Sequence, residues 1–471
     1  MTPLRILHVG AGYRPWRRGG LIAYVEDLMA EQAGRGHDVA YLVAGRYYPF
    51  LRRPRLHRWQ RGPIPMFEIL NSPLFDHGGQ PELELGEPRV EALLRQVLAD
   101  FRPDVVHVQE LAGLPSSVIE IVREHGTPVV VTLQDYFTVC PAFKLLDADG
   151  AVCLAREVGA ECVATIAAEG RPPRLLFDAT VRHEIVQRLA PLPVRLRVAI
   201  AAVVAPVVAV FTALVHRRPA PRDPAAFQRR RDVNVERLGA ADRVLAMSDR
   251  VREIHELLGV APERLETMHL TLSHIERLTP REWRGGPLTF ATLGGGESAP
   301  KGADLLLDAA RRLAADPPAG PYRLLIFGHV APRVAQAARA IPNVEVRPSY
   351  APDALDGLLD EVDVGIVPSL WEEAWGYVGP EFLAKAIPVL GNAIGGIPEY
   401  VEEGRTGWLN RSCSAEELAA VMRRLADGPG EAEELHRRLR AERDAVVLPF
   451  ARHADEVERV YRELVAAGPV G

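Results

Sequence analysis

The chain has 471 residues, 48% of them hydrophobic and 25% charged, so it has the composition of a soluble globular protein and is too long for one hydrophobic core. Its formal net charge of -6, from 56 basic and 62 acidic residues, gives no reason to expect a nucleic-acid partner. Four cysteines are too few for a disulfide scaffold, and the chain opens on a strand-like apolar run rather than a secretion signal, so we expect a cytoplasmic protein.

The first part of the chain alternates short apolar runs with amphipathic segments. A strand over 4–9, a helix over 20–34 and a strand over 39–43 form one strand-helix-strand unit. The same alternation predicts helices over 88–101, 115–124 and 249–258, and strands over 104–108, 128–133, 243–247 and 266–269. Strands separated by helices indicate a parallel sheet covered on both faces. We assign this series to a first domain, residues 1–280, with an insertion at about 163–235.

A polar, turn-rich stretch over 278–287 is expected to be a hinge. A second alternating series follows it, with strands predicted over 288–293, 322–327, 344–346 and 362–367, and helices from 303, near 332–340 and over 352–359. These elements form a second domain, residues 281–450, and the amphipathic helix 452–465 in the last segment, 451–471, is expected to pack back toward the first domain. The fold class is α/β, with two facing doubly wound domains and a cleft between them. Ligands of such folds bind beyond the carboxyl ends of the strands.

Two loops carry glycines in front of a helix. Gly19 and Gly20 precede the first helix, where free backbone N–H groups can approach an anion; the alternative is a flexible turn. The loop 294–302 places Lys301 beside a helix N-terminus, which suits a diphosphate. Because Lys301 is followed by Gly-Ala rather than Ser or Thr, a nucleoside-triphosphate loop is disfavoured, and Gly10-Ala11-Gly12 lacks the third glycine of an NAD site.

Two glutamates flank a glycine in the stretch 367–390. Glu373 lies in the loop after a predicted strand, Gly376 opens the next helix, and Glu381 lies inside that helix. A carboxylate accepts two hydroxyl hydrogen bonds with ease, so the pair suits a diol on each side of a diphosphate. The alternative is a helix-capping glutamate followed by a solvated one.

The order of residues in this region resembles the signature of the family 4 retaining glycosyltransferases. The matching residues are Pro368-Ser369, Glu373-x-x-Gly376, Glu381, Pro388-Val389, Gly395-Gly396-Ile397-Pro398-Glu399 and Gly404-x-Thr406-Gly407. The resemblance extends to Gly19-Gly20, 103–107, Ser248 and Lys301-Gly302. It implies the two-domain GT-B fold and a hexosyltransferase-like enzyme that moves a sugar, with retention, from a nucleoside diphosphate sugar of the UDP or GDP type. It implies no metal and no other cofactor.

The resemblance also implies roles for individual residues. Backbone N–H groups at the two glycines of the first helix, and at Gly376 and Tyr377, would contact phosphate or sugar, and Lys301 would neutralise the diphosphate. Glu373 would hold hydroxyls of the transferred sugar and Glu381 the ribose. The expected catalytic residues are Glu373, Lys301 and Asp135, and the expected donor-binding residues are Gly19, Gly20, Lys301, Gly302, Glu373, Gly376, Tyr377 and Glu381.

Two positions depart from the family. Gly296 stands where the family commonly has an arginine, so one phosphate contact is missing. Gln134 precedes Asp135 where the family commonly has histidine; its amide can hydrogen-bond a hydroxyl but cannot titrate. A catalytically inactive relative that binds nucleotide sugar or glycan is therefore the alternative function.

Two patterns have metal-site and non-metal interpretations. Asp147-Ala148-Asp149 imitates a metal-binding triplet, but the glycine after it favours a hairpin turn. Cys140, Cys153 and Cys162 would bind zinc only with a fourth ligand from elsewhere, and buried free thiols are favoured. We expect no metal site.

Residues 198–215 carry no charge and are flanked by Arg195, Arg197 and the basic run 216–218. A membrane span is disfavoured, because the chain on both sides belongs to one domain. In-plane docking on an anionic membrane, at its inner face and near a lipid-linked acceptor, stays open beside a helix packed within the insertion or against a partner chain. A peripheral membrane scaffold is thus a third hypothesis. The expected partners are a nucleotide-sugar donor and a glycan, lipid-linked or small-molecule acceptor, with no nucleic acid.

Overall fold

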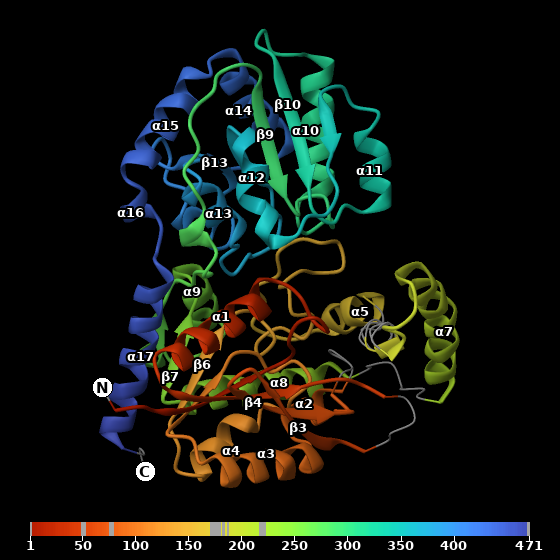
Figure 1. Cartoon of the computed structure of the whole chain (residues 1–471), viewed down its shortest axis with the longest axis vertical. Coiled ribbons are helices and arrows are strands. Elements are labelled where there is room, and N and C mark those ends of the chain that lie inside the picture. Colours follow the sequence, from red (N-terminus) through yellow and green to blue (C-terminus); the bar gives the residue numbers. More distant parts are fainter. Residues whose placement is uncertain are drawn as a thin grey trace. The chain divides into compact units, whose positions relative to one another are not determined.

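A computed structural model of the chain describes residues 2–48, 53–74, 80–169, 180, 184–185, 188–215 and 223–468. Its residues divide into two compact units (Figure 1). Unit 1 comprises residues 1–247, 252–268 and 454–471, and unit 2 comprises residues 248–251 and 269–453.

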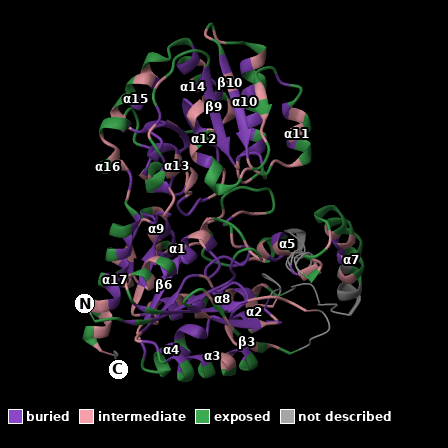
Figure 2. Ribbon diagram, viewed as in Figure 1, coloured by how far each residue is buried: buried purple, intermediate pink, exposed green. Residues whose placement is uncertain are grey.

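Unit 1 is built on an eight-stranded sheet in the order β3-β4-β2-β1-β5-β6-β7-β8. The strands are β1 (Arg5–Gly10), β2 (Asp38–Ala44), β3 (Arg55–Arg61), β4 (Ile64–Leu70), β5 (Val105–Val108), β6 (Val129–Leu133), β7 (Arg243–Ala246) and β8 (Leu265–Thr267). Neighbouring strands are parallel, except that β3 pairs antiparallel with β4 at the edge. The central strands are apolar runs buried on both faces, as a parallel sheet between helical layers requires (Figure 2).

The helices of this part of the chain are α1 (Gly20–Gly34), α2 (Pro81–Leu85), α3 (Pro88–Phe101), α4 (Val118–Glu124), α5 (Ala160–Glu169), α7 (Val194–Val215), α8 (Pro224–Ala240), α9 (Asp249–Leu257), the 3-10 turn η1 (Pro262–Arg264) and α17 (Phe450–Ala467). Among the described residues, no helix is both long enough and apolar enough to cross a bilayer.

Helix α8 is tied to unit 1 by long polar side chains, although most of its length falls in the range expected as an insertion. Asp223 caps it by accepting the Ala225 backbone N–H. Asn234 donates to the carbonyl of Thr138 at 2.9 Å, and Arg237 donates to the carbonyl of Leu85 at 2.7 Å. These bonds tie the helix to the loop after β6 and to the last residue of α2, and they satisfy one backbone carbonyl in each.

Unit 2 is built on a six-stranded parallel sheet in the order β11-β10-β9-β12-β13-β14. Its strands are β9 (Leu288–Leu293), β10 (Tyr322–Phe327), β11 (Val344–Val346), β12 (Val364–Val367), β13 (Val389–Asn392) and β14 (Gly407–Asn410). Its helices are α10 (Ala303–Ala315), α11 (Pro332–Ala338), α12 (Leu355–Leu358), α13 (Val378–Ala384), α14 (Ala415–Asp427), α15 (Gly430–Ala441) and α16 (Arg443–Val446), with 3-10 turns η2 (Ile275–Arg277), η3 (Pro352–Ala354), η4 (Leu359–Glu361) and η5 (Ile397–Glu399).

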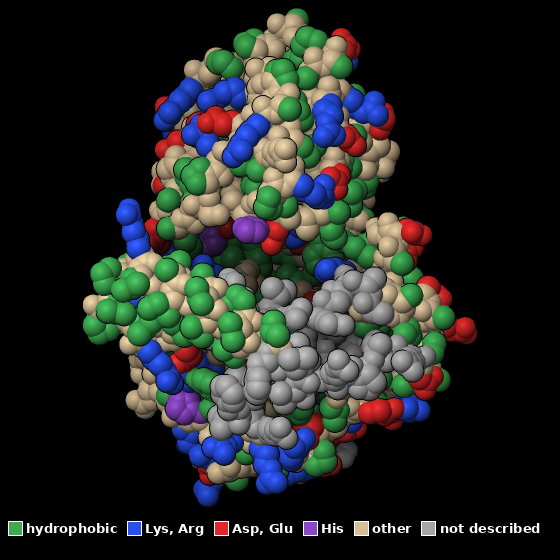
Figure 3. Space-filling model, turned by 90° about the vertical axis from the view of Figure 1, so that its right-hand side faces the viewer, with side chains coloured by type: hydrophobic (Ala, Val, Ile, Leu, Met, Phe, Trp, Pro, Cys, Tyr) green, Lys and Arg blue, Asp and Glu red, His purple; other side chains and the backbone are tan. Residues whose placement is uncertain are grey.

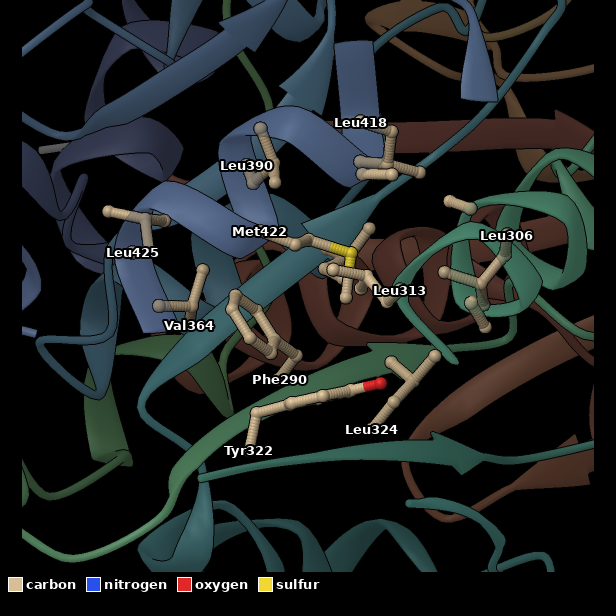
Figure 4. Close-up of a cluster of buried hydrophobic side chains, with 14 of the residues drawn as sticks. Phe290, Leu306, Leu313, Tyr322, Leu324, Val364, Leu390, Leu418, Met422 and Leu425 are labelled. Atoms are coloured by element: carbon tan, nitrogen blue, oxygen red, sulfur yellow. The ribbon is translucent and has the colours of Figure 1, made fainter. Parts of the chain in front are cut away.

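The core of unit 2 lies between this sheet and the helices α10 and α14. Leu306 and Leu313 of α10 and Met422 of α14 are each at most 1% exposed and pack with Phe290 of β9 and Val364 of β12 (Figure 4). Burying side chains of this kind contributes roughly 1.5–3 kcal/mol each. The strands of unit 2 are held by this apolar layer, so their ends are rigid supports for the loops that follow.

The last helix, α17, packs on unit 1, as the sequence analysis expected. The Tyr461 hydroxyl lies 2.5 Å from His107 Nδ1 of β5, and Tyr461 is fully buried. At the start of the same helix, Asp455 pairs with Arg35 at 2.6 Å and Glu458 lies 3.3 Å from His37 Nε2. An apolar ring and a set of polar contacts therefore hold this helix in place.

We predict that Tyr461→Ala lowers the free energy of unfolding by roughly 3–5 kcal/mol, because it empties a fully buried site. Tyr461→Phe keeps the ring and removes only the hydrogen bonds of the hydroxyl group, with His107 and Gln32, and should cost about 1 kcal/mol. Urea denaturation followed by circular dichroism measures both. The exposed neighbour Arg459→Ala is the control and should change stability by less than about 0.5 kcal/mol. Equal stability of Tyr461→Ala and the control would contradict the assignment of α17 to this core.

Candidate active site

The first strand of each sheet lies in its middle. In unit 1, β1 pairs with β2 on one side and β5 on the other; in unit 2, β9 pairs with β10 on one side and β12 on the other. The chain therefore leaves the first strand in one direction and later returns to its other side. At such a point the loops at the carboxyl ends of the two strands diverge and leave a crevice that binds ligands.

In unit 2, the loops after β9 and β12 meet through an ion pair. Lys301 Nζ lies 2.8 Å from both carboxylate oxygens of Glu373. Ser369 Oγ and Trp371 Nε1 each donate to Glu373 Oε2 at 2.9 Å. Glu373 is 8% exposed, whereas Lys301 is only half-buried, and its Nζ lies 5.3 Å from the centre of the Trp371 ring. Three donors thus fix one buried carboxylate beside an accessible ammonium group.

Two glycines lie close in sequence to the residues of this ion pair. Gly302 has φ of 81°, and a Cβ at this position would lie 1.9 Å from the carbonyl oxygen of Pro368. Gly376 has φ of 79°, and a Cβ there would lie 3.1 Å from Glu373 Cγ. Because L residues avoid this backbone region, both positions require glycine. The structure therefore brings together Lys301, Gly302, Glu373 and Gly376.

Packing accounts for the glycine at the position where the family commonly has arginine. A Cβ on Gly296 would lie 2.9 Å from Ile326 Cγ2 and 3.1 Å from Val330 Cγ1. A larger side chain would have to displace β10 or the loop after it. Where the family commonly has an arginine, this chain has a glycine whose backbone packs against Ile326 and Val330.

The other glutamates of the motif have separate partners. Glu372 pairs with Arg250 at 2.6 Å and does not share the Lys301 contact. Glu381, in α13, lies 2.8 Å from His274 Nε2 through its Oε1. Tyr377 stands at the N-cap of α13, in helical conformation. The sequence analysis missed His274, because a single histidine in a loop carries no signal of its own.

In unit 1, the two glycines of the first loop stand where they were expected. Helix α1 begins at Gly20, and the N-cap residue Gly19 has φ of 129° and makes no side-chain capping bond. A Cβ built on Gly19 meets no atom within 4 Å. The first N–H groups of this 15-residue helix thus have no side-chain cap from Gly19 and no acceptor within the helix.

The sequence analysis missed Glu110, in the loop after β5, whose carboxyl group interacts electrostatically with that of Asp135. Arg17 Nη1 lies 3.5 Å from Glu110 Oε1 and donates to the carbonyl of Ala11 at 2.6 Å. The pKa of Glu110 is raised to about 7, mainly by burial; Arg17 lowers it and the charge of Asp135 raises it, and the value of about 7 includes both effects. Burial also raises the pKa of Asp135, whose Oδ1 accepts the backbone N–H of Phe137 at 3.0 Å. The charge of Arg17 thus acts on both carboxyl groups at the switch point of this sheet.

Gln134, beside Asp135, is oriented by a buried polar network. Its Nε2 donates to Gln109 Oε1 at 2.8 Å. Gln109 Nε2 in turn lies 3.0 Å from His107 Nδ1 and 3.2 Å from His8 Nδ1. Burial lowers the pKa of His8 to about 4, so its ring is neutral near pH 7 and can accept a hydrogen bond. Within the described ranges, Gln134 Oε1 is buried and has no hydrogen-bond donor.

The acidic triplet and the three cysteines of the first domain form a turn and a thiol-lined cavity. Asp147 Oδ1 accepts the backbone N–H groups of Asp149 and Ala151, so the triplet closes a turn. Cys140, Cys153 and Cys162 are free thiols that line one cavity with Arg231. Across the part of the chain that the structure describes, no three His, Cys, Asp or Glu side chains gather closely enough to hold a metal ion.

The raised pKa of Glu110 predicts a dependence of stability on pH. Because the folded protein holds the proton more tightly than the unfolded chain, the contribution of Glu110 to stability is complete below its ordinary pKa of 4.5 and is lost as pH rises to about 7. Relative to Glu110→Gln, the wild type should therefore lose up to about 3 kcal/mol between pH 4.5 and pH 8.

Urea denaturation of both proteins across this range measures the difference. Glu124→Gln, at an exposed carboxylate of the same unit, is the control and should differ from wild type by a constant amount. A constant difference for Glu110→Gln as well would show that the carboxyl group is not desolvated.

Two family models match the chain. One, described as "Glycosyl transferase 4-like domain", matches residues 19–183, and the other, described as "Glycosyl transferases group 1", matches residues 288–428. The D-inositol 3-phosphate glycosyltransferase of Rhodococcus erythropolis is 26% identical over 242 residues, which are 47% of this chain and 54% of that protein. The chain thus matches about half the length of this relative.

Solved structures share the whole fold. Sucrose-phosphate synthase from Thermosynechococcus elongatus superposes with a TM-score of 0.62 at 16% identity and covers 98% of this chain and 99% of its own. Anabaena HepE in complex with UDP and glucose superposes with a TM-score of 0.58 at 14% identity, covering 98% of this chain and 100% of its own. The two domain matches show that the chain belongs to the family 4 glycosyltransferases, and the likeness to these solved structures, with the parallel sheets of both units, shows the GT-B fold.

Proposed function

We propose that this protein is a retaining glycosyltransferase that moves a sugar from a nucleoside diphosphate sugar to a glycan, lipid-linked or small-molecule acceptor. The observation that carries the proposal is the Lys301–Glu373 pair, set at the switch point of the unit 2 sheet in two loops that each carry a glycine with positive φ. We place the donor on unit 2 and the acceptor on unit 1.

Donor binding would exchange the partners of this ion pair. A diphosphate carries more negative charge than one carboxylate, so Lys301 would turn from Glu373 to the phosphates. Glu373 would keep its bonds from Ser369 and Trp371 and present its other oxygen to hydroxyls of the transferred sugar. Glu381 would bind the ribose in place of its contact with His274. The base would be uracil or guanine; the HepE neighbour holds UDP in the same fold.

The chemistry needs stabilisation of the departing diphosphate rather than a strong base. Lys301 and the backbone N–H groups near Gly376 and Tyr377 would supply positive potential where negative charge develops. Attack from the face that the nucleotide leaves would retain the anomeric configuration. In this scheme no metal or other cofactor takes part, because Lys301 supplies the charge that a cation would otherwise bring.

We predict that Lys301→Ala and Glu373→Gln each lower the release of nucleoside diphosphate at least about 100-fold, the loss typical when one group that stabilises a transition state is removed. A panel of UDP-, GDP- and ADP-sugars, with thermal shift and nucleotide release recorded together, measures binding and turnover. Glu416→Gln, an exposed glutamate on α14 of the same unit, is the matched control and should act as wild type.

The same panel separates the alternatives. A thermal shift without release, with glycan and lipid acceptors supplied, would favour a relative that binds nucleotide sugar but does not transfer it. No shift with any donor would overturn the assignment of Lys301 and Glu373 to a donor site.

We also propose that helix α7 docks on an anionic membrane surface, at the cytoplasmic face. Ala201 and Ala205 are buried, whereas Val203, Val207 and Val210, at helical spacing on the opposite side, are between 53% and 69% exposed. Figure 3 shows hydrophobic side chains gathered on the face that carries this helix. An exposed apolar stripe is the reverse of an ordinary surface helix, so it is expected to have an apolar partner.

A lipid surface fits the charges at the N-terminal end of this helix. Arg195 is exposed and Arg197 half-buried within the first turn, and further basic residues at 216–218, outside the described residues, follow the helix in sequence. Basic residues beside an apolar stripe are typical of helices that lie in the plane of an anionic bilayer. Such docking would place unit 1 near a lipid-linked acceptor.

We predict that the double variant Val203→Asp, Val207→Asp binds vesicles containing phosphatidylglycerol at least about tenfold more weakly than wild type, because both exposed apolar side chains are replaced by charges. Co-sedimentation with phosphatidylglycerol and phosphatidylcholine vesicles measures the effect. Leu257→Asp, at an exposed apolar residue outside α7, is the control. Vesicle binding that is absent in wild type, or unchanged in the variant, would contradict docking through α7.

A further inference from the structure

We propose that Glu110 and Asp135, with Gln134, form an acceptor site in unit 1 that selects a polyol or amino sugar and disfavours a phosphorylated sugar. This inference rests on the proposed function and names the chemistry of the acceptor. It concerns hydrogen bonding and charge at one end of the unit 1 sheet.

The site lies at the carboxyl ends of adjacent strands. Glu110 follows β5 and Asp135 follows β6, and these two strands pair in parallel. Arg17, in the loop after β1, contacts Glu110. The three loops thus meet at the switch point between β1 and β5, where folds of this kind bind their ligands.

The groups that line this corner accept hydrogen bonds. When it is ionised, the carboxyl group of Glu110 or of Asp135 accepts hydrogen bonds and cannot donate them. Gln134 Nε2 donates to Gln109, with its Oε1 at 2.8 Å and its backbone oxygen at 3.4 Å. The side-chain carbonyl oxygen of Gln134 is therefore the atom that can bind a ligand. That oxygen is buried without a donor in the described part of the chain, and a ligand donor would relieve its desolvation. Hydroxyl and ammonium groups supply such donors; a phosphate dianion supplies none.

The local charges also oppose a phosphate. Arg17 is one cation between two carboxyl groups, and it already donates to the carbonyl of Ala11. Arg230, the other cation that acts on Asp135, pairs with the buried carboxylate of Glu84 and donates to the carbonyl of Phe137. Arg18 is exposed and stands beside Gly19, at the helix N-terminus assigned above to the donor. A phosphate at Glu110 would therefore face negative charge. Arg17 and Arg230 do not offset this charge, because they already contact oxygens of the protein.

The pKa of Glu110 is consistent with this chemistry. Burial raises the pKa of this carboxyl group to about 7, so near neutral pH it can lose its proton and accept a hydrogen bond from a hydroxyl or ammonium group instead. A phosphate would raise its pKa still further and would be repelled by the ionised form.

The test measures binding, so it does not depend on turnover. The full chain is titrated with methyl α-D-glucoside, glucosamine and glucose 6-phosphate, and each complex is followed by ligand-observed saturation-transfer NMR. We expect the neutral and amino sugars to bind at least about tenfold more tightly than the phosphate. Glu110→Gln and Asp135→Asn should each weaken glucosamine binding and lower the ratio of the affinity for glucosamine to that for glucose 6-phosphate. Asp149→Asn, an exposed aspartate of the same unit, is the matched control.

Two results would overturn the inference: binding of glucose 6-phosphate as tight as that of the other two sugars, or no binding of methyl glucoside and glucosamine at millimolar concentration. Unchanged selectivity in both variants, with wild-type selectivity as expected, would also overturn the roles of Glu110 and Asp135. Thermal shift by nucleotide sugars is recorded on the same samples. A donor shift with no sugar selectivity contradicts the acceptor inference alone, whereas loss of the donor shift in wild type contradicts the proposed function itself.

Discussion

The position of the first strand in the middle of each sheet is the constraint on which both candidate sites depend. In unit 2, β9 has β10 on one side and β12 on the other, and the loops after β9 and β12 bring Lys301 to Glu373 across 72 residues of sequence. In unit 1, β1 lies between β2 and β5, and the corresponding loops bring Arg17 to Glu110. The rigid strand ends let a carboxylate be held among fixed donors, and the glycines of these loops follow from the close approach of backbone that the geometry demands.

Buried polar groups connect the unit 1 site to the rest of its fold. Tyr461 of the last helix contacts His107, His107 contacts Gln109, and Gln109 fixes the amide of Gln134. Because each group would be costly to bury alone, the chain of hydrogen bonds both anchors α17 and decides which atom of Gln134 stays available. Positioning of that amide therefore depends on a helix that begins more than 300 residues further along the chain.

Long apolar strands and well-patterned helices could be predicted from the sequence, whereas β3 and α8, which are rich in arginine, could not. The bounds predicted for β9, β10, β11 and α3 agree with the structure, since each is a distinct periodic or apolar run. The hairpin of β3 and β4 was missed: β3 is an edge strand whose sequence, RLHRWQR, is rich in basic residues. Helix α8 was missed for a related reason, because its arginines satisfy buried carbonyls instead of facing water. At the site, the resemblance located Lys301 and Glu373, while Glu110 and His274 become visible only when the fold supplies their neighbours.

The two switch points have the same geometry and opposite hydrogen-bonding character. Unit 2 offers an ammonium group and backbone N–H donors, and it balances Glu373 with Lys301 until an anion takes the lysine. Unit 1 offers carboxylate and amide oxygens, and it limits the charge of Glu110 by holding a proton near neutral pH. In the proposed function, the first arrangement suits the diphosphate that departs and the second suits the hydroxyl that attacks. A phosphate acceptor would require the unit 1 corner to present donors that Gln134 and Arg17 have already committed to protein oxygens. The difference between the sites thus lies less in their shape than in which partner each polar group already has.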